Sequence, residues 1–370
     1  GGAGAEYEIT GHKWFCSAPM SDFFLVLAQT DDGLSCFLMP RILPDGTRNA
    51  FHIQRLKDKL GNRSNASAEV EYDAALAWLV GEPGRGVRTI IEMVSATRLD
   101  CVLGSAAIMR QACVTAVHYA AGRRTFGAPL ISHPLMTSVL ADLAAESEAA
   151  TTLAMRLASA ADQAARGDAE QAALLRIALP AAKFWVCKRA PMVAAEALEC
   201  LGGNGYVEES DLPRLYREAP LNSVWEGSGN ITALDVLRAL SRSPAAGEAL
   251  LAEAELAAGA DPRLDAAIAA LRAAVTSVTA ANGTGSAVAE DQARGLAGLI
   301  AVVLQAGLLN RHAPATVAAA FCASRLGSQP GAVLAGPALP FGAGPFGTVT
   351  ERSARAALLD RFRPAGTVEG

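Results

Sequence analysis

Glu226 is the residue best placed to do chemistry in this chain of 370 residues. It follows the apolar pair Val224-Trp225 and precedes Gly227, in the segment Val-Trp-Glu-Gly-Ser-Gly-Asn at 224–230. A carboxylate before a glycine is usually a solvated turn residue or a charge at a helix N-terminus. Here the apolar neighbours would disfavour the charged form, and the glycines would leave room for a ligand. The residues alone are therefore compatible with a general base beside a ligand pocket, and equally with a solvated turn residue.

The glycine-rich segment Gly202-Gly203-Asn204-Gly205 is a second candidate. It follows a predicted helix and not a strand, which argues against a Rossmann dinucleotide fingerprint. A helix C-cap with a tight turn is the simpler interpretation, and close approach of the backbone to a phosphate is the alternative. A Ser-His-Asp hydrolase is disfavoured, because the chain has five histidines and no Gly-x-Ser-x-Gly elbow.

The composition limits the classes of partner and site. Hydrophobic residues make up 51% of the chain and charged residues 19%, which is typical of a globular protein of two or three domains. A net charge of -5 gives no overall attraction to nucleic acid or to an anionic membrane.

The seven cysteines form no Cys-x-x-Cys pair. We therefore expect reduced, mostly buried thiols in a cytoplasmic protein, with neither a metal site nor a disulfide framework.

No targeting or membrane segment is predicted. The first residues lack the basic and apolar parts of a signal peptide. The longest apolar run, 295–309, is too short to cross a bilayer and contains Gln305. We expect a buried helix there and no membrane partner.

Residues 1–83 are predicted to form strands. Ala68, Val70 and Tyr72 alternate with acidic residues, which is the period of a half-buried strand. Turn-forming residues separate the apolar runs. A small antiparallel barrel or sandwich is expected, ending at the Gly/Pro-rich segment 81–86.

Residues 84–240 are predicted to form an antiparallel helix bundle. Apolar residues at 3–4 spacing from Leu99 to Val117 predict one long helix. Pro180 and Pro191 could bend or divide a later one. Further helices are expected over about 134–166, over about 172–201 and from near 230.

Residues 241–370 are predicted to form an additional helical region. Their composition shifts to Ala, Leu, Gly and Arg, and a Pro/Gly-rich stretch covers 328–347. The predicted fold class is therefore α+β, mainly α, with an antiparallel β-domain followed by helices.

Several segments resemble signatures of the acyl-CoA dehydrogenase family, in the family's order. Each is weak alone, but together they match over residues 5–240. They are Gly-His-Lys-Trp-Phe-Cys-Ser at 11–17, Lys-Leu-Gly-Asn-Arg-Ser at 59–64, Arg-Arg-Thr-Phe-Gly at 123–127, Leu-Gly-Gly-Asn-Gly-Tyr at 201–206, Arg-Leu-Tyr-Arg at 214–217 and Trp-Glu-Gly-Ser at 225–228. The strings at 57–66, 180–184, 208–217 and 222–231, and the additional helical region, are similar to the AidB-type, DNA-alkylation-response branch.

The resemblance implies roles for individual residues. Glu226 corresponds to the base that removes the α-proton of an acyl-CoA thioester, and Arg98 to an arginine near that base. FAD would accept the hydride. Arg123 and Phe126 would meet FAD across a subunit interface. The residues that the resemblance places at FAD are Phe15, Cys16, Ser17, Arg123, Phe126, Gly202, Gly203, Val224, Trp225, Gly227, Ser228, Gly229 and Asn230.

The sequence departs from the family pattern at several positions. Ser17 replaces a commoner Thr, and Asn230 stands where many relatives have Gln. Pro134, beside His133, stands where a cofactor-contacting Gln is common. Relatives also carry an N-terminal helical domain and a flavin-holding segment that would precede residue 1. The chain therefore resembles the C-terminal two-thirds of the family.

Three functions agree with the resemblance. The first is an FAD-binding homologue of the alkylation response with weak acyl-CoA dehydrogenation, in which Trp225 narrows the acyl pocket. The second is an ordinary metabolic acyl-CoA dehydrogenase that feeds an electron-transfer flavoprotein. The third is a DNA-binding protein with a structural flavin, in which double-stranded DNA meets arginines of the C-terminal region. These are Arg311, Arg325, Arg352, Arg355, Arg361 and Arg363. A cytoplasmic homotetramer, built as a dimer of dimers, is expected.

Overall fold

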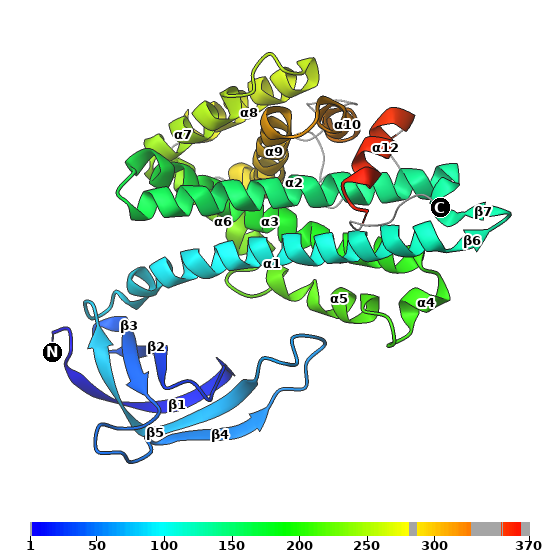
Figure 1. Ribbon diagram of the computed structural model, residues 1–370. Coiled ribbons are helices and arrows are strands. Elements are labelled where there is room, and N and C mark those ends of the chain that lie inside the picture. The colour runs from blue at the N-terminus through cyan, green and yellow to red at the C-terminus, as the bar shows by residue number, and fades with distance from the viewer. Residues whose placement is uncertain (1, 281–286, 327–348, 350, 364–370) are drawn as a thin grey trace. The chain divides into compact units, whose positions relative to one another are not determined.

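The computed structural model describes residues 2–280, 287–326, 349 and 351–363. They fall into two compact units, 1–97 and 98–370 (Figure 1). The first unit holds a sheet and the second a helix bundle. The long helix α1 (Gly86–Gly122) begins in the first unit and continues in the second.

Five strands form one curled antiparallel sheet in the first unit. They are β1 (Glu6–Ser17), β2 (Phe23–Thr30), β3 (Gly33–Pro40), β4 (Phe51–Leu56) and β5 (Ser67–Val80). The long strand β5 is central, because it pairs with β1, β3 and β4. Alternate side chains such as Val26, Met39, Val70 and Leu79 form the core of the unit. The predicted antiparallel β-domain is confirmed as a single curled sheet.

The second unit is a helix bundle with one continuous hydrophobic core. After α1 its helices are α2 (Pro134–Ala165), α3 (Ala169–Cys200), α4 (Gly203–Tyr206), α5 (Leu212–Glu218), α6 (Gly229–Arg242), α7 (Pro244–Glu255), α8 (Pro262–Ala280), α9 (Ala287–His312), α10 (Ala315–Leu326) and α12 (Arg352–Asp360). The shorter elements are β6 (Arg124–Thr125), β7 (Ala128–Pro129), η1 (Leu130–Ser132) and η2 (Leu221–Ser223). The helices predicted from periodicity are confirmed.

Helix α3 runs without a break through Pro180 and Pro191. Ile177, Phe184 and Val193, on either side of these prolines, are buried in the core. An interior proline costs an isolated helix about 3 kcal/mol, and here tertiary packing offsets that cost. The two prolines therefore do not divide the helix.

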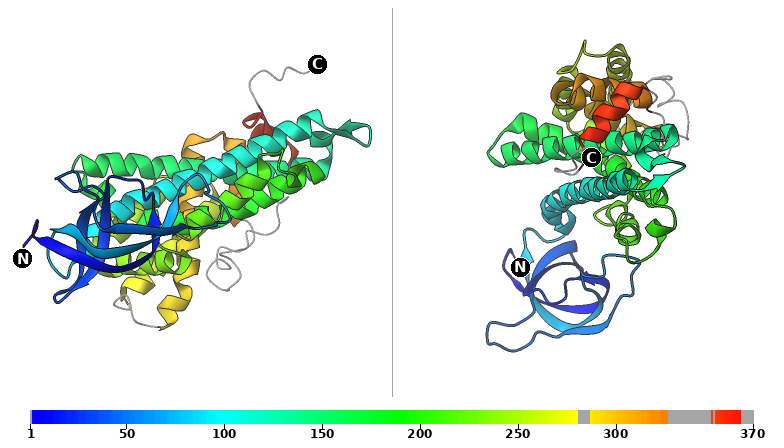
Figure 2. Two further views of the ribbon diagram at one scale, coloured as in Figure 1. Left: turned by 90° about the horizontal axis from the view of Figure 1, so that it is seen from below. Right: turned by 45° about the vertical axis from the view of Figure 1, so that its right-hand side comes forward.

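The helices beyond residue 241 pack into the same core as the bundle. Figures 1 and 2 show α7, α8, α9 and α10 on one side of α2 and α1 on the other. Glu253 of α7 binds Arg156 of α2 at 2.7 Å and Arg311 of α9 at 2.9 Å. This ion-pair network around the buried Glu253 ties the additional region to the bundle.

Helix α9 contains the apolar run at 295–309. By length and composition α1 and α9 could each cross a membrane, but 83% of the most apolar window of α9 is buried in the bundle. The helix predicted to be buried is therefore a core helix. The Pro/Gly-rich stretch predicted at 328–347 lies outside the described residues.

All seven cysteines are free and buried, as expected from the sequence. Desolvation raises the pKa of Cys187 and of Cys200 to about 12. A thiol of this kind stays protonated and unreactive at neutral pH. No group of three or more His, Cys, Asp or Glu side chains within the described ranges could hold a metal ion.

Candidate active site

Glu226 lies in the loop between η2 and α6, in a strained backbone conformation. Its φ is +56° and that of Gly227 is +101°. The left-handed region is unfavourable for a residue with a Cβ and is commonly retained at functional sites. A Cβ on Gly227 would lie 3.1 Å from Nη2 of Arg98. The sequence Glu-Gly therefore specifies a sharp corner that presents Glu226.

Two buried cations hold three consecutive carbonyl groups of this corner. Lys183 Nζ donates to the carbonyl oxygens of Trp225 and Gly227, each at 2.8 Å. Arg98 Nε donates to the carbonyl oxygen of Glu226 at 2.9 Å. Lys183 also binds the carbonyl of Asn222 at 3.0 Å. Hydrogen bonds from charged donors are the stronger kind, so they offset the backbone strain.

Arg98 and Lys183 are themselves fixed by their surroundings. Arg98 is only 7% exposed, and its Nη1 binds Asp235 of α6 at 2.7 Å. Arg176 binds the other oxygen of Asp235 at 2.9 Å. Lys183 is 2% exposed, and burial lowers its pKa. The expected role of Arg98 near the base agrees with this geometry.

Lys183 and Asp235 were not among the candidate residues named from the sequence. The available signal for Lys183 was a single lysine within the apolar segment Pro-Ala-Ala-Lys-Phe at 180–184. A lysine is almost never buried unless its ammonium group is satisfied. Its three carbonyl partners come from a loop about 40 residues later in the sequence, so the pairing depends on tertiary structure.

Arg98 and Lys183, which bind the carbonyls of residues 225–227, are called the clamp below. The clamp leaves the functional groups of Glu226 available. Within the part of the chain that the structure describes, no group accepts the backbone N–H of Glu226 or binds its half-buried carboxylate. The carboxylate can therefore take a proton, and the N–H can hold an oxygen that becomes negative. One residue thus offers both a carboxylate that can accept a proton and an N–H that can donate to an oxyanion.

The remaining residues of the segment line the same corner. Trp225 Nε1 donates to Oδ1 of Asn222 at 3.1 Å, which fixes the indole beside Glu226. Val224, Ser228 and Asn230 are exposed. Ser228 caps α6 without a side-chain hydrogen bond. The first N–H groups of α6 are therefore available to an acceptor.

Arg123 and Phe126 lie just after the C-terminal end of α1. Phe126 and Gly127 form the turn of the β6–β7 hairpin, with φ values of 49° and 83°. Phe126 is 98% exposed. His133 Nε2 is 3.0 Å from the carbonyl oxygen of Thr125, and its ring meets Phe126 edge-on at 6.0 Å. An exposed aromatic residue on a rigid hairpin is suited to contact another molecule.

Gly202 and Gly203 lie close to this hairpin end. Gly202 follows α3 with φ +59°, so the predicted helix end and tight turn are confirmed. A Cβ on Gly202 or Gly203 would meet nothing within 4 Å. Asn204 Nδ2 donates to the hydroxyl of Tyr119, near the end of α1. The open backbone at the two glycines is the form that close approach of a phosphate would need.

The second unit thus holds two separate groups of candidate residues. Arg98 is beside Glu226, whereas Arg123 follows the last residue of α1. At a rise of 1.5 Å per residue, the helix between Arg98 and Gly122 is roughly 36 Å long. Within one chain, the two groups cannot contact the same part of one ligand.

Phe15, Cys16 and Ser17 lie on β1 of the first unit. A register shift between Lys13 and Cys16 interrupts the alternation of the strand. Phe15 is therefore 61% exposed and not part of the core, whereas Cys16 is buried. Lys57 Nζ lies 4.6 Å from the centre of the Phe15 ring. The exposed Phe15 ring is available to stack against a ligand.

Comparison with known proteins relates this geometry to one family. The acyl-CoA dehydrogenase middle-domain model matches residues 2–75, and the C-terminal-domain model matches residues 84–241. AidB of Escherichia coli (strain K12) is 58% identical over 236 residues, which are 64% of this chain and 43% of AidB. The chain thus spans less than half the length of this relative.

Solved structures give the same assignment. A Caenorhabditis elegans protein, ACDH-11 in complex with C11-CoA, is 30% identical with a TM-score of 0.77. The match covers 87% of this chain and 60% of that protein, so it extends into the additional region. A Bacillus anthracis acyl-CoA dehydrogenase with FAD shares the fold at 17% identity and a TM-score of 0.76, over 97% of this chain and 71% of its own. The chain belongs to the acyl-CoA dehydrogenase family, and its identity to AidB is consistent with the AidB-type branch.

Proposed function

We propose that the protein is an FAD-binding oxidoreductase that removes two hydrogens from an acyl-CoA thioester. The observation that carries this proposal is the clamped corner at Glu226. Arg98 and Lys183 bind three successive carbonyls there, while the carboxylate and N–H of Glu226 are left without partners among the described residues. Family membership supports the choice of substrate and cofactor.

Each step of the proposed reaction can be assigned to a residue of the chain or to FAD. The Glu226 carboxylate takes the α-proton of the thioester, and its N–H holds the thioester carbonyl as negative charge develops. The clamp keeps both groups oriented, so little reorganisation is needed when the proton moves. FAD, when bound, supplies the acceptor for the hydride that leaves the β-carbon.

Several features of the chain fit FAD. The open glycines Gly202 and Gly203 and the uncapped start of α6 suit phosphate oxygens. The exposed Phe15 and Phe126 suit ring contacts. Because the part of α1 from Arg98 to Gly122 separates Glu226 from Arg123, we propose that each FAD is shared by two subunits. A homotetramer built from such dimers agrees with this arrangement.

Dye reduction by the full-length protein tests the proposal. Glu226→Gln should abolish acyl-CoA-dependent reduction while FAD stays bound, because the amide cannot accept the proton. Glu209→Gln, an exposed position in the loop before α5, is the matched control and should act as wild type. Unchanged turnover in Glu226→Gln would reject the role of the base.

The physiological role is proposed from the AidB-type resemblance. We propose weak dehydrogenation in the service of the alkylation response, supported by the identity to AidB and by the additional region. The fixed Trp225 indole beside Glu226 would narrow the acyl pocket. An ordinary metabolic dehydrogenase is the alternative. Fast, saturable turnover with short or branched acyl-CoA would favour that alternative.

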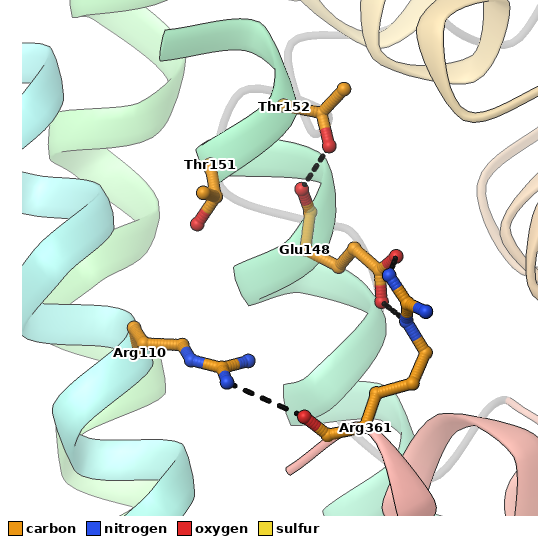
Figure 3. Close-up of a pocket in the computed structure, with 5 residues that line it drawn as sticks. All are labelled: Arg110, Glu148, Thr151, Thr152 and Arg361. Carbon is orange, nitrogen blue, oxygen red and sulfur yellow. Dashed lines mark hydrogen bonds and ion pairs between the residues drawn. The ribbon is translucent and has the colours of Figure 1, made fainter. Parts of the chain in front are cut away.

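A DNA-binding function gains little support from the C-terminal arginines. Figure 3 shows Arg361 paired with Glu148, while Arg110 donates to the Arg361 carbonyl. Other arginines of the set are also engaged within the chain, namely Arg311 with Glu253, Arg325 with Asp142 and Glu146, Arg363 with Asp360, and Arg355 with the carbonyls of Val349 and Pro134. A guanidinium held by a carboxylate is poorly available to a phosphate. Tight, salt-dependent binding of duplex DNA would nevertheless establish this function.

A further inference from the structure

Arg294 links the additional helical region to the start of α6. It lies on α9, beyond residue 241, where the match to the family model ends. Its Nη1 donates to Oδ1 of Asn230 at 2.8 Å. Asn230 is the second residue of α6, in the segment that also carries Glu226. A residue outside the dehydrogenase domains therefore touches a candidate cofactor residue.

This contact determines which end of the Asn230 amide faces outward. A guanidinium group can only donate hydrogen bonds, so the amide atom that meets Arg294 must be the oxygen. The Nδ2 donor is then directed away from Arg294. The Asn230 side chain is exposed, and no acceptor for Nδ2 occurs in residues 2–280, 287–326, 349 or 351–363. The amide is thus held ready to donate to an acceptor-rich ligand.

Positive charge surrounds the same helix start. Arg294 Cζ lies 5.5 Å and Lys188 Nζ 5.8 Å from the centre of the Phe184 ring. Lys188 also packs closely on Gly229, where a Cβ would lie 2.4 Å from its Cε. Burial, and then the charge of Arg294, lower the pKa of Lys188. Lys188 and Arg294 thus bring two positive charges to the first turn of α6.

We propose that Arg294 is a positioning residue of the FAD site. It holds Asn230 so that Nδ2 donates to an oxygen of the dinucleotide. This inference rests on the proposed function, because it takes FAD as the occupant of the site. It gives the region beyond residue 241 a direct part in cofactor affinity.

Titration of FAD into the full-length apoprotein, followed by flavin fluorescence, tests the inference. Arg294→Ala should raise the Kd of FAD about five- to tenfold, the size expected when the one ordinary hydrogen bond from the Asn230 amide is lost. Arg294→Lys keeps a donor and should restore part of the affinity. Arg272→Ala is the matched control, because Arg272 of α8 pairs with Glu255 at the surface and its loss changes the net charge equally. It should leave the Kd unchanged.

A double-mutant cycle tests whether Arg294 acts through Asn230. Asn230→Ala alone should weaken FAD binding, and Arg294→Ala should then add no further loss. An undiminished effect of Arg294→Ala in the Asn230→Ala background would overturn the inference. The inference would also be overturned if the wild type binds FAD and the Kd of Arg294→Ala equals that of Arg272→Ala. Wild-type protein that binds no FAD would instead reject the proposed function itself.

Discussion

At the residue scale, Glu226 combines an unfavourable backbone with an available carboxylate. A left-handed conformation costs a residue with a Cβ about 1–2 kcal/mol. Arg98 and Lys183 offset this cost through the carbonyls of residues 225–227. The strained backbone therefore helps to orient the proposed base, and mutation can separate its effect on stability from its effect on activity.

Replacement of Glu226 by small residues should reveal the strain. Glu226→Gly removes the steric cost of φ +56°, whereas Glu226→Ala keeps it. We expect the glycine variant to be more stable than the alanine variant by about 1 kcal/mol in urea unfolding, while both are inactive. An alanine variant as stable as the glycine variant would show that the corner is unstrained.

Loss of Lys183 should weaken both the fold and the corner. Lys183→Met keeps the length of the side chain but leaves three carbonyls without their donor. We expect a loss of about 2–4 kcal/mol in the free energy of unfolding, with slower flavin reduction in the folded fraction. Lys13→Met, at an exposed site on β1, is the control and should change stability little. Equal stabilities of the two variants would contradict the clamp.

At the element scale, a fully buried ion cluster joins α2, α3 and α10. Glu146 of α2 pairs with Arg189 of α3 at 3.1 Å and with Arg325 of α10 at 2.9 Å. Burial alone would raise the pKa of Glu146, but the charges of Arg189 and Arg325 outweigh it and lower the pKa to about 2. The cluster therefore stabilises the folded bundle only while Glu146 is ionised.

The pH dependence of unfolding should report this cluster. The pKa of Glu146 is lower in the folded than in the unfolded chain, where it is near 4.5. The contribution of Glu146 to the free energy of unfolding is therefore present above about pH 4.5 and is lost as the pH falls toward about 2. Glu146→Gln should cost about 3–5 kcal/mol at pH 7, and the gap to wild type should narrow below about pH 4.5. A gap that stays constant down to pH 3 (about one unit above the folded pKa) would contradict this account.

The elements were more predictable from the sequence than their contacts. Periodicity located α2 and the alternation of β5, because burial on one face leaves a local pattern. The continuity of α3 through Pro180 depends on packing that no local pattern records. Family resemblance located Glu226 and Arg98, but Lys183 was missed because its partners are distant in sequence. The register shift that exposes Phe15 likewise depends on pairing with β5.

At the scale of the whole molecule, the proposed FAD site needs a second copy of the chain to bring the two groups of candidate residues to one cofactor. Glu226 lies beside Arg98 and Arg123 follows the last residue of α1, so roughly 36 Å of helix separates them. A cofactor that meets both types of residue therefore takes them from different subunits. Under this proposal, each FAD site forms only when two chains assemble.

Mixed dimers should show this sharing. Glu226→Gln and Arg123→Ala variants are each expected to be inactive or nearly so. When they are unfolded together and refolded, a mixed dimer regains one intact site of its two, and activity should reappear. Separately refolded variants mixed afterwards are the control. No recovery in mixed dimers of confirmed composition would mean that both residues serve a site within one chain.

The central claim is that Glu226 removes the α-proton in an FAD site. Anaerobic mixing of the purified full-length holoprotein with a straight-chain acyl-CoA, followed by visible absorbance, tests it most directly. The account predicts that the flavin bands of wild type and of Glu209→Gln bleach in a single turnover. In Glu226→Gln the flavin should remain bound, and its rate of reduction should fall by at least about a hundredfold. Bleaching of Glu226→Gln at the wild-type rate would contradict the account.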